Sequence, residues 1–152
     1  MLLDRRLIKL FKDFQKIPRG IHIQDPDKLV PLSLKLDKKL SDALKSKNLW
    51  VFFTKRSLKH ISEKRQGAEI CLQMIYETVR NPDTLRKGKD SRFLVSKTFH
   101  VNEKPYPYLV GIEVSKEAII IITAFIANKT YLRNFEILWR TETLSNGPSI
   151  ST

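Results

Sequence analysis

A helical pattern that ends at a proline and precedes several strand-like segments constrains the fold of this chain most. From Thr54 onward, apolar residues such as Leu58 and Leu72 recur at spacings of three and four, which predicts an amphipathic helix. Gly67 is a point at which this helix can bend or break. Asn81-Pro82 ends it, because proline disfavours a helical conformation in the residue before it.

Strand-like segments follow this helix. Alternating or β-branched runs occupy residues 92–101, 108–114 and 118–127. Residues 104–107 link the first two runs, and residues 115–117 are short enough to make the last two a hairpin. Residues 135–139 are able to add another strand. Helices followed by a meander predict an α+β fold, with N-terminal helices packed on an antiparallel sheet of four or more strands.

The N-terminal part of the chain has shorter signals. Residues 2–14 have the pattern of an amphipathic helix, residues 37–48 of a short helix, and residues 21–23, 32–36 and 49–53 of short strands. Since 152 residues suit one domain of ordinary size, we predict a single domain over residues 1–144. Within it, residues 1–48 hold N-terminal helices and short strands, residues 49–140 form the core, and residues 145–152 are a loose tail.

The charge of the chain points to a polyanionic partner. Lys and Arg outnumber Asp and Glu by 28 to 16, for a net charge of +12. Nucleic acid is the partner that this excess favours, with anionic lipid, an acidic protein or mere solubility as alternatives. The N-terminus carries charges before any long apolar run, unlike a secretory signal. No apolar run is long enough for a transmembrane helix.

Several common chemistries lack their motifs here. The sequence has no glycine-rich phosphate loop and no His-Glu-x-x-His motif, and His22, His60 and His100 are scattered. The carboxylates are dispersed, so we predict neither a metal site nor a cofactor. RNA cleavage without metal needs only a base, an acid and cations for the phosphorane, and it requires the 2′-hydroxyl that DNA lacks.

Two windows hold most of the positive charge. Residues 54–65 and 86–97 each contain five basic residues and one acidic residue, and so carry +8 of the net +12. Packing of the sheet on the helix is expected to bring them to one face as an RNA-binding groove, although residues 86–89 also fit a solvated loop. The residues predicted to contact RNA are Lys55, Arg56, Lys59, Lys64, Arg86, Lys87, Lys89, Arg92, Tyr131 and Arg133.

Four residues are candidates for catalysis. His60 lies beside the apolar stripe of the helix, and Arg65 occupies a position in that stripe, where a guanidinium needs a partner or an anion. Lys97 lies in an apolar register of its strand, and Thr123 shares a strand face with Ile121. Three of them also have a plain structural explanation: Arg65 reaching solvent at the rim of the core, His60 packing or exposed, and Thr123 bonding within the sheet.

The order of these motifs resembles the barnase, EndoU, colicin and RelE superfamily of toxin nucleases, especially its phage-type members. The resemblance covers roughly residues 50–135. The histidine stands in Leu58-Lys59-His60-Ile61, the turn after the helix is Asn81-Pro82-Asp83, and the Thr-Ala-aromatic strand is Ile122-Thr123-Ala124-Phe125. A second histidine that often follows the first in phage-type members is replaced here by Lys64-Arg65.

The resemblance implies a role for each candidate. His60 would be a general acid or base, Arg65 with Lys64 would bind the scissile phosphate, Lys97 would stabilise the phosphorane, and Thr123 would position the phosphate or sugar. It also implies an acidic antitoxin or immunity protein as a partner, and a cytoplasmic location in a bacterial or phage-infected cell. We therefore expect a metal-independent endoribonuclease. The alternatives are an RNA-binding or ribosome-associated module without catalysis, and a membrane-surface or protein-interaction domain.

Overall fold

The computed structural model describes residues 3–47, 49–64, 66–116 and 118–141. Its helices are α1 (Arg5–Gln15), α2 (Lys38–Leu44), α3 (Lys55–Ser62), α4 (Ala68–Arg80) and α5 (Lys129–Leu132). Its strands are β1 (Leu29–Lys35), β2 (Trp50–Thr54), β3 (Thr84–Lys87), β4 (Arg92–Val101), β5 (Lys104–Val114), β6 (Ile119–Ile126) and β7 (Ile137–Arg140). No helix in the described ranges is long and apolar enough to cross a membrane.

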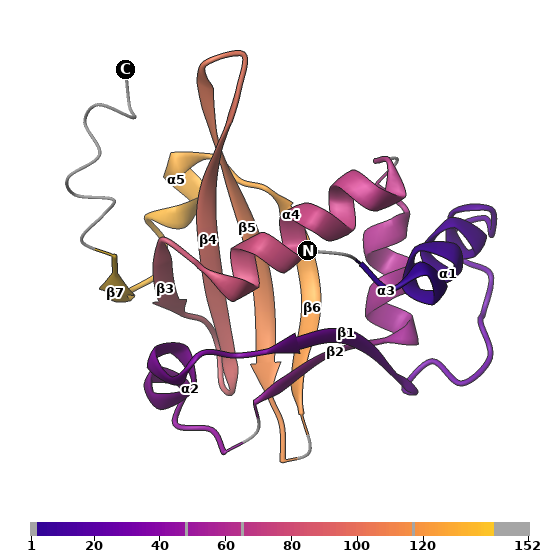
Figure 1. The fold of residues 1–152 in the computed structure, drawn as a ribbon, viewed down its shortest axis with the longest axis horizontal. Helices are drawn as coiled ribbons and strands as arrows, with labels where there is room; N and C mark the ends of the chain where they lie inside the picture. Colours follow the sequence, from indigo (N-terminus) through magenta and orange to yellow (C-terminus); the bar gives the residue numbers. More distant parts are fainter. Residues whose placement is uncertain (1–2, 48, 65, 117, 142–152) are drawn as a thin grey trace.

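All seven strands form one sheet in the order β1-β2-β6-β5-β4-β3-β7 (Figure 1). Strands β3 to β6 form an antiparallel meander, of which the sequence predicts β4 to β6, and β7 extends it by pairing with β3. The pair β2 and β6 is parallel and covers only Ile119–Ile121 of β6. The predicted α+β class, with helices packed on a sheet of four or more strands, is confirmed.

The predicted long helix is two helices in the structure. Thr54 caps α3 through a reciprocal capping box with Ser57, which supplies partners for backbone groups that a helix start leaves free. That helix ends at Ser62, and α4 begins after Gly67. Asn81 is the C-cap of α4, where the following proline was expected to end it. Arg65 falls between the two helices, outside the described residues.

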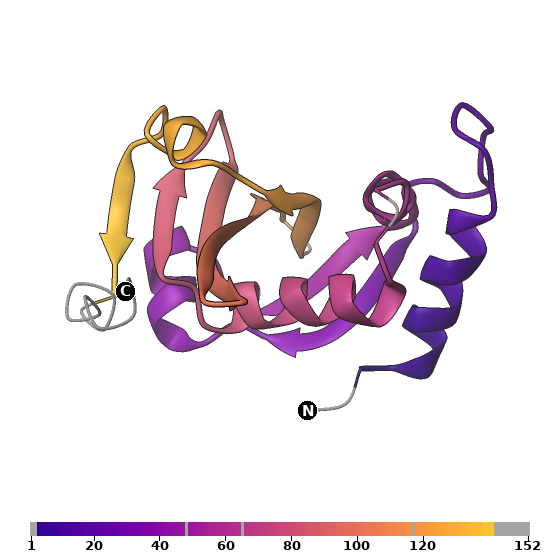
Figure 2. The same cartoon turned by 90° about the horizontal axis from the view of Figure 1, so that it is seen from above.

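Helices lie on both faces of the meander (Figures 1 and 2). We call the face covered by α4 the inner face. It contributes Val95, Val110 and Ile112 to the main core, together with Leu72 and Ile75 of α4. We call the opposite face the outer face. There the short helix α5 packs through Leu132 against a smaller cluster, whose members are Leu94, Leu109, Phe125 and Ala127.

A β-bulge in β6 moves Thr123 away from its predicted face. Gly111 of β5 pairs with Thr123, whereas the next residue, Ile112, pairs with Ile121, so Ile122 is an extra residue in β6. Strict alternation places Thr123 beside Ile121. Because of the bulge, Ile121 and Ala124 lie in the main core, and a Cβ on Gly111 would lie 3.0 Å from Thr123 Cγ2 and 3.7 Å from Leu94 Cδ2. Thr123 therefore lies on the outer face with Leu94.

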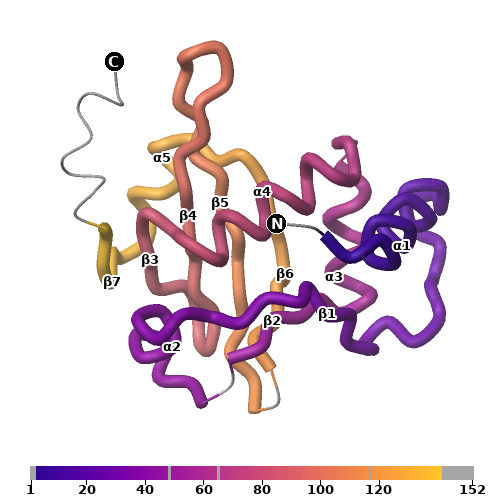
Figure 3. The backbone as a smooth tube through the Cα atoms, viewed as in Figure 1, coloured from indigo at the N-terminus to yellow at the C-terminus, as the bar shows by residue number. Residues whose placement is uncertain are grey.

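Three other local predictions differ from the structure. Residues 104–107, predicted as a link, are the first residues of β5, and β4 and β5 form a long hairpin that projects from the sheet (Figure 3). Residues 21–23 do not form a strand. Residues 84–87, which include part of the expected loop, form β3 because they pair with both β4 and β7. The predicted tail, residues 145–152, lies outside the described residues.

Candidate nucleic-acid interface

The basic residues of the second window divide between the two faces of the sheet. Arg86 and Lys87 are neighbours in β3, so their side chains point in opposite directions. Lys87 lies 4.6 Å from the ring of Phe93 on the inner face and donates a hydrogen bond to the Asp90 carbonyl. Lys97, also on the inner face, donates to the carbonyl of Asn81 at the end of α4 over 3.1 Å. The structure therefore does not bring Lys97 or Lys87 to the face that carries Thr123.

Several predicted RNA-binding residues already have carboxylate partners. Lys59 is only 6% exposed, and its Nζ lies 2.5 Å from Oε2 of Glu63. The hydrogen bond from Lys59 holds the pKa of Glu63 below its usual value. Arg56 pairs with Asp27 at 3.1 Å, and Arg92 with Glu113 at 3.2 Å.

The other predicted site residues of the two windows differ in their exposure to solvent. Lys55 is half-buried at the start of α3, and Lys89 is exposed in the turn after β3. His60, the predicted acid or base, is exposed on the last turn of α3. Arg86 lies on the outer face, opposite Leu94 of β4.

Lys64 joins the end of α3 to the outer face. Beyond Ile121 strand β2 no longer pairs with β6, and α3 contacts β6 instead. The Nζ of Lys64 donates to the Ala124 carbonyl over 2.7 Å and lies 4.8 Å from the centroid of the Phe125 ring. Burial lowers the pKa of Lys64 because desolvation disfavours an ammonium ion. The region of His60 is thus attached to the strand that carries Thr123.

Aromatic side chains continue from Lys64 along the outer face. The ring of Phe125 meets Tyr131 with centroids 5.5 Å apart, and Tyr131 meets Phe135 at 5.3 Å. Tyr131 remains 38% exposed. Exposed aromatic rings beside cations are the usual means by which proteins hold single-stranded nucleic acid, because bases stack on the rings.

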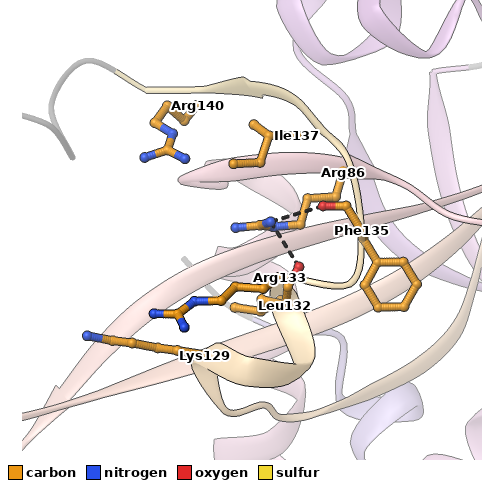
Figure 4. A pocket seen from close by; sticks show the side chains of 7 residues that line it. All are labelled: Arg86, Lys129, Leu132, Arg133, Phe135, Ile137 and Arg140. Carbon is orange, nitrogen blue, oxygen red and sulfur yellow. Dashed lines mark hydrogen bonds between the residues drawn. The ribbon is translucent and has the colours of Figure 1, made fainter.

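A basic pocket lies between α5, β3 and β7, at the other end of this aromatic row. It is open, has a volume of about 520 Å³ and is lined by Arg86, Lys129, Leu132, Arg133, Phe135, Ile137 and Arg140. The Nη1 of Arg86 donates to the carbonyls of Leu132 and Phe135, over 2.9 and 3.2 Å. Burial lowers the pKa of Arg86, and the positive charge of Arg140 lowers it further. In Figure 4 the cationic groups of all four basic residues lie on the same open side.

The outer face therefore collects part of the predicted site and adds residues that sequence reasoning missed. Thr123, Lys64, Tyr131, Arg86 and Arg133 lie on it or at its rim. Lys129 and Arg140 are new. Lys129 lies in a helix too short to have a clear pattern, and Arg140 reaches the pocket only because β7 pairs with β3, with Arg140 opposite Thr84.

Among the described residues, no group of three or more His, Cys, Asp or Glu side chains is placed to hold a metal ion. Comparison with known proteins gives no match, whether to family models, to curated sequences or to solved structures.

Proposed function

We propose that the protein is an endoribonuclease that holds and cuts single-stranded RNA on the outer face of the meander. The contact of Lys64 with Ala124 and Phe125 is the observation that carries this proposal. It attaches the helix that bears His60 to the strand that bears Thr123, and these are two of the elements on which the resemblance to toxin nucleases rests.

Binding is supported by the kinds of side chain on this face. The rings of Phe125, Tyr131 and Phe135 offer surfaces on which bases stack in any sequence. Lys64 lies at one end of the row, and the basic pocket with Arg86 lies at the other. The net charge of +12 adds a long-range attraction for a polyanion.

The proposed reaction uses the RNA's own 2′-hydroxyl. Its oxygen attacks the adjacent phosphorus after losing a proton to a base, the bond to the 5′-oxygen breaks, and that oxygen takes up a proton. The products are a 2′,3′-cyclic phosphate and a 5′-hydroxyl. His60 is the candidate for proton transfer. Lys64 is the candidate for stabilising the charge on the phosphorane, and the Thr123 hydroxyl for a hydrogen bond to the phosphate.

Incubation with total RNA in the presence of a chelator tests this proposal. We expect cleavage to continue and the products to end in 2′,3′-cyclic phosphates. The variant His60→Ala should cut at least about a hundredfold more slowly, which is the usual contribution of a general acid or base. His100→Ala is the matched control, since His100 is also exposed but lies in the β4–β5 hairpin. Equal rates for His60→Ala and the unmodified protein would remove His60 from the mechanism.

A second function from another class has its own support. Lys97 lies on the inner face, so the full set of catalytic residues implied by the resemblance does not meet. An RNA-binding or ribosome-associated module that uses the same face without chemistry is therefore the alternative. Such a module binds RNA with a steep dependence on salt and leaves the strand intact.

For either function, an acidic antitoxin or immunity protein is the protein partner that we propose for the outer face. It would compete with RNA for the same cations. The cytoplasm of a bacterial or phage-infected cell is the proposed location.

A further inference from the structure

The basic pocket holds four cations that have no carboxylate partner among the described residues. Within the described part of the chain, Arg86, Lys129, Arg133 and Arg140 form no ion pair with a carboxylate, and Arg86 bonds only to backbone carbonyls. The Nε of Arg86 is buried and has no hydrogen-bond partner. Like charges gathered in this way repel one another, and a bound anion relieves that repulsion.

The pocket is built to hold an anion at a fixed place. The two carbonyl bonds fix the guanidinium of Arg86 at the base of the pocket, and Lys129, Arg133 and Arg140 surround its open side (Figure 4). Guanidinium groups match the geometry of phosphate oxygens, because their planar N–H groups can donate in parallel. A phosphate group is therefore the ligand chemistry that the pocket suits best.

The position of the pocket separates it from the proposed cleavage site. Arg86, Leu94, Gly111 and Thr123 pair in turn across four strands, so they lie in one row of the sheet. With neighbouring strands about 4.8 Å apart, Arg86 and Thr123 are separated by about 14 Å. One phosphate does not reach both. A strand held at Thr123 and running along the aromatic row therefore presents a different phosphate to the pocket.

We propose that Arg86, Lys129, Arg133 and Arg140 form a phosphate-binding subsite, which takes a phosphate of the RNA strand outside the bond that is cut. This inference rests on the proposed function, because it takes the outer face as the RNA-binding face. The subsite fixes the register of the strand and carries no sequence information of its own, as is usual for phosphate contacts.

Binding of a single-stranded RNA oligonucleotide at several salt concentrations, measured by fluorescence anisotropy, tests the subsite. The variant is the double substitution Arg133→Gln and Arg140→Gln, because both side chains are exposed and Arg86 has a structural role. We expect affinity to fall about tenfold, and the slope of log affinity against log salt to decrease by about 0.7, the contribution of one single-strand phosphate contact.

The matched control carries Arg5→Gln and Lys12→Gln, which remove the same charge from exposed positions of α1 at the far end of the molecule (Figure 2). Its affinity should stay within about twofold of the unmodified protein, because distant charges are screened. Thermal unfolding of all three proteins checks that they are folded.

The outcomes separate the two proposals. If the unmodified protein does not bind RNA, the proposed function fails. If it binds RNA and the pocket variant binds with equal affinity and slope, the subsite is overturned while the function stands. A parallel titration with inorganic phosphate follows the Arg86 side-chain N–H by NMR. A shift of that signal, combined with unchanged RNA affinity in the variant, would assign the pocket to a free phosphate compound and overturn its assignment to the strand.

Discussion

The two faces of the meander use the same four strands for different purposes. On the inner face α4 seals an apolar core, and the lysines at its edge, Lys87 and Lys97, are bound to backbone carbonyls. On the outer face the short helix α5 is the cover, and aromatic rings and the cations of the basic pocket remain accessible. Strand alternation, more than closeness in sequence, therefore decides which basic residues are able to act together. Arg86 and Lys87 are adjacent and serve opposite faces.

The largest effect should come from truncating the inner face. Leu72 of α4 is fully buried in the main core, so Leu72→Ala should lower the free energy of unfolding by about 2–5 kcal/mol. Leu132→Ala on the outer face removes a side chain from the smaller cluster and should cost less. Urea unfolding measures both. An equal or larger loss for Leu132→Ala would show that the outer face is no less a part of the core than the inner face.

Two tyrosines, one on each side of the sheet, test whether RNA binds to the outer face. Tyr131 is 38% exposed in the aromatic row, and Tyr106 is 37% exposed on the β4–β5 hairpin, opposite Phe99 and thus on the inner side. Tyr131→Ala should weaken RNA binding by about 1–3 kcal/mol, the usual value of one stacked base. Tyr106→Ala should leave the affinity nearly unchanged. Equal losses of affinity in the two variants would disconnect stacking from the outer face.

A glycine tests whether the bulge places Thr123 on the outer face. A Cβ at Gly111 would lie 3.0 Å from the Cγ2 of Thr123, so Gly111→Ala should lower the free energy of unfolding by about 1 kcal/mol. Adding Thr123→Ser removes the methyl group and keeps the hydroxyl, and should restore most of this loss. Thermal unfolding measures the cycle of single and double variants. Strict additivity of the two substitutions would argue against the contact.

The smallest effect concerns pH. Burial depresses the pKa of Lys64 in the folded protein, so between that pKa and the unfolded value of about 10.4 the unfolded chain binds more protons. Stability contributed by this group therefore rises as pH increases through that window, and the penalty is full below it. The free energy of unfolding is measured for the unmodified protein and for Lys64→Met at a series of alkaline pH values. As pH increases through this window, the value for the unmodified protein should rise relative to that for Lys64→Met. Parallel curves would show that Lys64 is not desolvated.

Local signals in the sequence were enough to predict much of the fold. Asn81-Pro82 marks the end of α4, and the alternation over residues 92–101 matches β4 residue for residue, including the sides taken by Phe93 and Leu94. These features depend on neighbouring residues, and neighbouring residues can be read directly from a sequence.

The misplaced parts of the candidate site depend on long-range contacts. The extra residue in β6 is defined only against β5, so alternation alone put Thr123 on the wrong face. The basic pocket exists because β7 pairs with β3, which no local pattern around Arg140 indicates. Lys97 lies in an apolar register, and its Nζ donates a hydrogen bond to the Asn81 carbonyl at the end of α4. The sequence pattern alone does not tell whether such a lysine makes a structural contact or acts in catalysis.

The most direct test compares two half-buried lysines on opposite faces of the meander. Lys64 and Lys97 each donate to a backbone carbonyl, at 2.7 and 3.1 Å, so replacement of either by Met should cost a similar stability of about 1 kcal/mol. The measurement is the rate of RNA cleavage in chelator at a temperature where both variants are folded. We expect Lys64→Met to cut about 100-fold or more slowly and Lys97→Met to cut at the rate of the unmodified protein. Loss of cleavage in Lys97→Met with full activity in Lys64→Met would contradict this expectation.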